Sequence, residues 1–143
     1  MSRAGNKDPH CCVCGIDNPV GLRVRFAPYG VQRSRARYTA RAEHAGWDGI
    51  LHGGVIFALM DEALGWSLYF QNIAAVTARV ETRFHVPIPV GASLVVTARV
   101  VKRRRRIFEA RAEIRIDGSG DTLLAEAAAI MFAVGSKSGE AET

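Results

Sequence analysis

The sequence has little of what marks secreted, membrane-spanning or disordered proteins. It has three cysteines, all between residues 11 and 14, which are too few and too close together for a disulfide framework. No basic segment followed by an apolar one opens the chain, so no signal peptide is expected. Of its 143 residues, 48% are hydrophobic and 23% are charged, which is the balance of one ordinary globular domain. We therefore expect a cytoplasmic protein with a single core.

The longest apolar run, residues 53–70, approaches the length of a membrane span. Asp61 and Glu62 lie at its centre, and each would cost about 2.5 to 3.5 kcal/mol inside a bilayer. We therefore predict no membrane insertion and a buried helix in a globular domain. The stripe that should face the core is formed by Ile56, Leu59, Met60, Ala63 and Leu64.

Alternating apolar and polar residues predict strands on both sides of this helix. The expected strands cover residues 22–26, 33–41, 76–86, 94–100, 108–116 and 122–134. One long helix and a series of antiparallel strands indicate an α+β fold in which the sheet packs on the helix. The predicted division is an irregular lead-in at residues 1–21, one domain at residues 22–134 and a polar tail at residues 135–143.

Candidate chemistry gathers at the start of the helix. The helix would begin with the segment His52-Gly53-Gly54. Free backbone N–H groups and the helix dipole at this end favour an anion or an oxyanion, and glycine lets a ligand approach the backbone. Asp61 could act as a base or nucleophile. Eight helical residues separate it from Gly53 by roughly 12 Å, so one substrate would need antiparallel helices from two chains.

Structural explanations compete with this one. The two glycines could form a tight helix entry, with His52 a flanking polar residue. Asp61 could be a buried acid held by an N–H group or an arginine. Glu62 is predicted to be structural, because consecutive helical residues point about 100° apart and cannot face one pocket equally.

Three segments together resemble the hotdog-fold acyl-CoA thioesterases of the phenylacetate-pathway type. They are residues 52–61 (HGGVIFALMD), 77–79 (TAR) and 84–91 (FHVPIPVG), and the likeness extends from about Cys11 to Val134. The resemblance implies a single hotdog domain, an antiparallel sheet wrapped around one long helix. It also implies a homodimer or homotetramer that hydrolyses an acyl-CoA, with no cofactor beyond the coenzyme A of the substrate.

The resemblance also implies roles for four residues. Asp61 matches the family's general base or nucleophile, and Gly53 the glycine whose N–H polarises the thioester carbonyl. His52 matches the histidine beside that glycine, and Thr77 a residue that holds the water or the acid. Strict alternation places Thr77 on the opposite face from its neighbours, so this role requires a local bulge or a strand start; otherwise it is an ordinary strand threonine.

The chain departs from the family pattern at Gly46, where some relatives carry Asn or Gln. Either another residue such as Asp48 completes the site, or the protein binds thioesters and hydrolyses them slowly. Pocket walls are expected from Phe57, Met60, Leu64 and Trp47, which would suit a hydrophobic or aromatic acyl group.

The formal charge of +5 includes a cationic run at residues 102–106, where two strands should meet. Arg103, Arg104 and Arg105 suit the phosphates of coenzyme A, although a solvated hairpin tip is the structural alternative. A nucleic-acid surface is the third interpretation, and it ranks below coenzyme A because no aromatic residues interleave with the arginines.

The segment His10-Cys11-Cys12-Val13-Cys14-Gly15 contains a Cys-x-x-Cys pair. Structural zinc normally takes four ligands, and no second cysteine pair exists, so a structural N-terminal clasp is preferred to a metal site. The alternative that one of these cysteines is a reactive thiol is kept.

Two other functions remain open for the whole chain. A dehydratase or hydratase of the same fold would use His52 and an acid as an acid–base pair. A non-catalytic acyl-CoA sensor or a basic nucleic-acid-binding module belongs to a different class, and glycine at position 46 is the feature that keeps a non-catalytic role among the alternatives.

Overall fold

The computed structural model describes residues 7–118 and 122–136. Within these ranges, the single α-helix is α1 (Gly53–Tyr69), preceded by the short 3-10 helix η1 (Ala42–His44). The strands are β1 (Ala27–Pro28), β2 (Arg33–Thr39), β3 (Ile73–Phe84), β4 (Ser93–Arg104), β5 (Ile107–Ile116) and β6 (Leu123–Ser136). Within the described ranges, no helix is long and apolar enough to cross a membrane.

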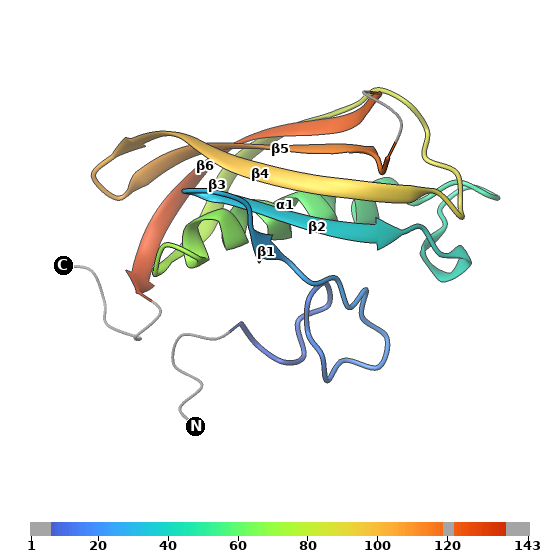
Figure 1. Cartoon of the computed structure of the whole chain (residues 1–143), viewed down its shortest axis with the longest axis horizontal. Coiled ribbons are helices and arrows are strands. Elements are labelled where there is room, and N and C mark those ends of the chain that lie inside the picture. Colours follow the sequence, from blue (N-terminus) through green and yellow to red (C-terminus); the bar gives the residue numbers. More distant parts are fainter. Residues whose placement is uncertain (1–6, 119–121, 137–143) are drawn as a thin grey trace.

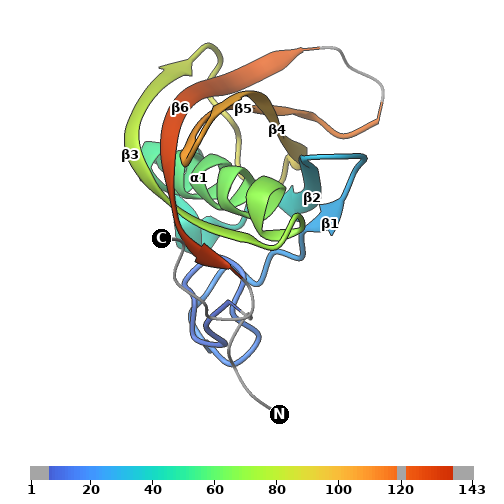
Figure 2. The same ribbon diagram turned by 90° about the vertical axis from the view of Figure 1, so that its left-hand side faces the viewer.

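The strands form one antiparallel sheet in the order β1-β2-β4-β5-β6-β3. Figure 1 shows α1 lying along this sheet, and Figure 2 shows the sheet curving around the helix. The 12-residue strand β3 is an edge strand, because only β6 pairs with it in the sheet order. The α+β architecture predicted from the sequence is confirmed.

The core lies between α1 and the concave face of the sheet. The predicted apolar stripe is buried, with Leu59, Met60 and Leu64 at 0% exposure. From β2, the hydroxyl of the buried Ser34 donates a hydrogen bond to the Ala63 carbonyl at 2.6 Å. The opposite side of the helix, which includes Phe57 and Asp61, is only half-buried.

The prediction of a strand at residues 22–26 is wrong. Its backbone groups bond to the N-terminal loop instead, with Leu22 N–H donating to the Cys12 carbonyl and Val24 N–H to the Val13 carbonyl, both at 2.9 Å. The intervening Arg23 has a φ of 55°, which is incompatible with an extended strand. At the other end, β6 continues to Ser136, two residues beyond the predicted boundary, and the remaining tail lies outside the described residues.

A register shift in β3 lies between Thr77 and Arg79, opposite β6. Ala75 and Thr77 are half-buried before it and Val80 after it, while Ala78 is exposed. This irregularity is a local bulge, one of the two arrangements by which the sequence allowed Thr77 to face the helix. The bulge therefore turns Thr77 towards α1.

Candidate active site

The start of α1 presents a backbone donor. His52 is the N-cap residue, and its Nδ1 accepts the Gly54 N–H at 2.8 Å. The His52 N–H donates to the His44 carbonyl at 2.9 Å. Among the described residues, the Gly53 N–H has no acceptor. The helix N-terminus therefore offers this donor, reinforced by the helix dipole, to a ligand.

A hollow of about 490 Å³ lies beside this donor. It is lined by Gly46, Trp47, Leu51, His52 and Gly53. Trp47 is 84% exposed, so its indole is available to contact a ligand. Trp47 and the helix start, which were both predicted to bind the substrate, lie together at this hollow.

Gly46 leaves room for the histidine. A Cβ at this position would lie 3.1 Å from both Cα and Cδ2 of His52, closer than most side-chain contacts. An asparagine or glutamine would therefore require His52 to shift. The glycine that departs from the family pattern therefore leaves the space in which the His52 ring lies. Asp48, which is exposed, lies two residues after Gly46 in the sequence.

A support behind His52 was not anticipated from the sequence. The Tyr38 hydroxyl and His44 Nδ1 lie 2.8 Å apart, and His44 provides the carbonyl that holds the His52 N–H. Burial, and then the nearby Arg41, lower the pKa of His44, while burial raises the pKa of Tyr38. The spacing of these residues in the sequence carries no signal for this contact, which depends on β2 lying beside η1.

Asp61 and Thr77 form the second half of the site. The Thr77 hydroxyl donates to Asp61 Oδ1 at 2.7 Å, and both side chains are half-buried. Among the described residues, Asp61 Oδ2 has no partner. This geometry holds the carboxylate in one orientation and leaves one oxygen for a water molecule or a substrate.

A single chain does not bring the two halves together. Asp61 is absent from the lining of the hollow and lies eight residues along α1 from Gly53, or about 12 Å. Position 53 is instead next to β3, where a Cβ would lie 3.8 Å from Phe84 Cε1. The residues predicted to line the pocket differ in burial. Phe57 is half-buried, whereas Met60 and Leu64 are completely buried in the core. In this chain, the core rather than the hollow takes up Met60.

The arginine run forms the tip of the β4–β5 hairpin. Arg103, Arg104 and Arg105 are exposed, and Arg105 adopts a φ of 58° in the turn. The Arg103 guanidinium lies 4.9 Å from the Phe108 ring centre. Paired residues across the sheet run from Arg103 through Phe108 and Met131 to Thr77. Three strand spacings amount to about 14 Å, and Thr77 contacts Asp61. The hairpin tip therefore lies on the Asp61 side of the chain rather than on the Gly53 side.

The cysteine segment lies against α1 next to this site. Cys11 Sγ and Cys14 Sγ lie 3.5 and 3.3 Å from the two carboxylate oxygens of Glu62. Burial, and then the Glu62 carboxylate, raise the pKa of the Cys14 thiol. A raised pKa disfavours a reactive thiolate at Cys14. The contacts agree with the predicted clasp and with a structural role for Glu62.

Residues 48–123, just over half of the chain, match the profile of the thioesterase superfamily. The chain belongs to the thioesterase superfamily. No curated protein shows significant similarity to it. Within the superfamily, the curved antiparallel sheet around α1 is the hotdog fold expected from the sequence resemblance.

Solved structures of superfamily proteins share this fold at low identity. Protein RHA08564, described as a thioesterase superfamily protein, is 24% identical with a TM-score of 0.80; the match covers 87% of this chain but only 60% of that longer chain. PaaI from the Escherichia coli phenylacetic acid degradation operon is 22% identical with a TM-score of 0.74, covering 80% and 82% of the two chains. The smu.793 protein of Streptococcus mutans, bound to acetyl CoA, is 19% identical with a TM-score of 0.73, covering 79% and 90%.

Proposed function

We propose that this superfamily member hydrolyses an acyl-CoA thioester at a site composed of two chains. The observation that carries the proposal is that one helix, α1, holds two complementary halves of an active site. One half is the Asp61 carboxylate held by Thr77 at 2.7 Å. The other is the Gly53 N–H beside the hollow at the helix start. A base and an oxyanion donor are the two groups that acyl transfer to water requires.

Edge strand β3 supplies a surface for the second chain. Val76 and Phe84 on this strand are 52% and 55% exposed, and Val86 just beyond it is 41% exposed. A long edge strand with exposed apolar side chains favours pairing with another chain. An antiparallel partner strand would extend the sheet across a two-fold axis and would place the half-buried sides of the two α1 helices next to each other.

The positions of the two halves along β3 determine where the axis would lie. Thr77 contacts Asp61, and Phe84 lies beside Gly53. Because the bulge adds one residue at Ala78, a two-fold axis at Glu81 places Thr77 of one chain opposite Phe84 of the other. Asp61 of one chain then approaches Gly53 of its partner, and symmetry creates two equivalent sites.

In the proposed reaction, Asp61 Oδ2 takes a proton from water as the water oxygen attacks the thioester carbonyl carbon. The oxyanion accepts the Gly53 N–H of the partner at the helix N-terminus. When the carbon–sulfur bond breaks, the leaving thiolate takes the proton from Asp61. The products are the free acid and CoA, and the carboxylate is regenerated. Thr77 keeps Oδ1 occupied, so Oδ2 faces the water.

The substrate proposal rests on the walls around these groups. Trp47 at the hollow and the half-buried Phe57 on α1 would contact an apolar or aromatic acyl group. Gly54 lets the acyl end approach the backbone of the first helical turn. The exposed Arg103, Arg104 and Arg105 would bind the phosphates of coenzyme A. The bound acetyl CoA of the S. mutans neighbour supports a CoA ligand for this fold.

The experiment that tests this function measures thiol release from short, long and aromatic acyl-CoAs. The wild-type protein should release CoA, and Asp61→Asn should not, while both elute as the same oligomer in size-exclusion chromatography with light scattering. Water loss from a 3-hydroxyacyl-CoA without thiol release would instead identify the dehydratase. Absence of both reactions despite thermal stabilisation by CoA would show a binding protein, and salt-sensitive binding of DNA or RNA without CoA binding would reject the thioester function.

A further inference from the structure

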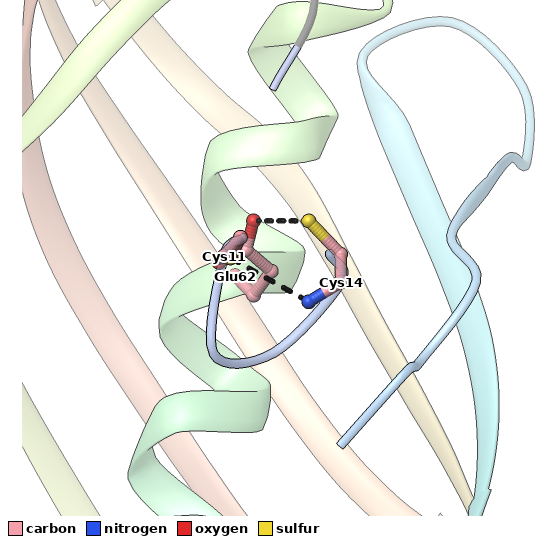
Figure 3. Close-up of side chains that lie close together, drawn as sticks. All are labelled: Cys11, Cys14 and Glu62. Atoms are coloured by element: carbon pink, nitrogen blue, oxygen red, sulfur yellow. Dashed lines mark hydrogen bonds between the residues drawn. The ribbon is translucent and has the colours of Figure 1, made fainter. Parts of the chain in front are cut away.

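Three metal-ligating side chains converge where the N-terminal segment crosses α1. Figure 3 shows Cys11 and Cys14 from the N-terminal loop facing Glu62 on the helix. One ligand atom from each lies within 4.8 Å of the others. The two cysteines are 51 and 48 residues from the glutamate in the sequence. We propose that Cys11, Cys14 and Glu62 bind a zinc ion that fastens the N-terminal segment to α1.

The separations of the ligand atoms suit zinc. Zinc–sulfur bonds of about 2.3 Å and zinc–oxygen bonds of about 2.0 Å at tetrahedral angles place sulfur and oxygen about 3.5 Å apart. Here Cys11 Sγ lies 3.5 Å from Oε2 of Glu62 and Cys14 Sγ lies 3.3 Å from Oε1, so each sulfur has this separation from a different oxygen of the carboxylate. Two thiolates and a carboxylate favour zinc over magnesium or calcium, which prefer oxygen ligands alone. A water molecule would fill the fourth position.

The cysteine loop already has the backbone conformation that supports a thiolate ligand. Cys11 Sγ accepts the N–H groups of Val13 at 3.4 Å and Cys14 at 3.5 Å. Gly15 permits this tight loop, since a Cβ there would lie 2.4 Å from the Cys11 nitrogen and the Pro9 oxygen. N–H groups directed at sulfur stabilise negative charge on it. The site therefore needs little rearrangement to bind a metal.

The charges around the site balance when zinc is present. Zinc with two thiolates and one carboxylate leaves one negative charge, and the two thiol protons are released to solvent. Lys7 Nζ lies 3.2 Å from Glu62 Oε1 and supplies the compensating positive charge. Gly65 provides the space, because a Cβ there would lie 3.1 Å from that ammonium. Lys7 thus acts as an outer partner of the ligating carboxylate.

The position of the site indicates a structural function. The loop that carries the cysteines also places Val13 and Val24 in the core, at 4% and 3% exposure. Glu62 follows Asp61 on α1 and points about 100° away from it. The zinc ion would therefore stabilise the helix turn that carries Asp61 without contacting the thioester, and its presence does not depend on the proposed hydrolysis.

The test uses the full chain, with any affinity tag removed, in a thiol-free reductant. Zinc per chain is measured after dialysis against zinc chloride, and cobalt is titrated as a spectroscopic probe. We expect about one zinc per chain and tetrahedral cobalt absorption with a thiolate charge-transfer band. Cys11→Ser and Cys14→Ser should weaken binding by more than about 100-fold, and Glu62→Gln should weaken it by at least about 10-fold.

Cys12→Ser is the matched control, because this neighbouring cysteine is exposed and lies outside the cluster. It should keep full zinc binding. Equal binding by wild-type protein and Cys11→Ser, or no zinc bound to wild-type protein, would overturn the proposal. X-ray absorption of the zinc-loaded wild-type chain tests the ligands without a variant. Two sulfur atoms in the first shell support the site, whereas a shell of nitrogen and oxygen alone refutes it.

Discussion

The composite site predicts that two inactive variants restore activity when they form mixed dimers. Asp61→Asn removes the base from one chain. Gly53→Pro removes the oxyanion donor from the other with little change in the helix, because proline suits the first helical position. His52 has φ −63° and ψ 136°, which a residue before proline readily adopts. A Cβ at position 53 has only ordinary contacts.

The expected magnitudes follow from the positions of the two groups. Loss of one oxyanion donor should reduce kcat by about 10²- to 10³-fold, and loss of the base should reduce it at least as much. In a mixed dimer, one site combines both defects and the other combines Asp61 of the proline variant with Gly53 of its partner. Random association of equal amounts gives half mixed dimers, each with one intact site, so about a quarter of wild-type activity should return.

The assay denatures and refolds the two variants together, then measures thiol release from an acyl-CoA. Separately refolded variants mixed afterwards are the control, together with each variant refolded alone. Light scattering establishes the oligomer and circular dichroism the fold. Because about 12 Å of helix separates the groups in one chain, recovery requires two chains. Activity that stays at the level of the single variants, in dimers shown to be mixed, would refute the composite site.

Four further changes test other parts of the molecule. Thr77→Val should reduce kcat about 10- to 100-fold through loss of the hydrogen bond to Asp61, whereas Thr77→Ser should retain most activity; equal effects would show that the hydroxyl is unimportant. Leu59→Ala should lower the free energy of unfolding in urea by about 2 to 5 kcal/mol, since this side chain is completely buried. Arg104→Ala should raise KM for acyl-CoA with little change in kcat, and the difference from wild type should shrink in high salt. Burial lowers the pKa of His44 below its ordinary 6.5, so the unfolded chain takes up a proton at a higher pH than the folded chain does. The free energy of unfolding should therefore fall as the pH drops through 6.5 towards the lower folded pKa. Urea unfolding at pH 7.5 and 5.5 should show a smaller fall for His44→Gln than for the wild-type protein.

Local patterns in the sequence were sufficient to predict the helix and most of the sheet. The eighteen-residue apolar run after His52 is too long for a typical strand, and α1 occupies residues Gly53–Tyr69 of it. The alternation at residues 33–39 reappears as buried and exposed positions of β2. These features were readable because helix and strand periodicities depend on near neighbours in the chain.

The resemblance implied that Thr77 holds either the attacking water or the acid Asp61, but the sequence alone could not orient the threonine. The register shift beside Ala78 turns the threonine inward, and it arises from how β3 pairs with β6. Strict alternation would have placed this side chain on the other face. The bond at 2.7 Å therefore depends on the tertiary register.

Local spacing along the chain is enough to locate the start of the helix, its apolar face and the residue types at its first turn. The contact of Glu62 with Cys11 and Cys14 becomes visible only in the folded chain. Only the tertiary structure also showed that residues 22–26 bond to the N-terminal loop rather than to the sheet. Both outcomes depend on contacts between distant segments, whose backbone and side-chain partners are chosen when the core packs and leave no periodic pattern along the chain.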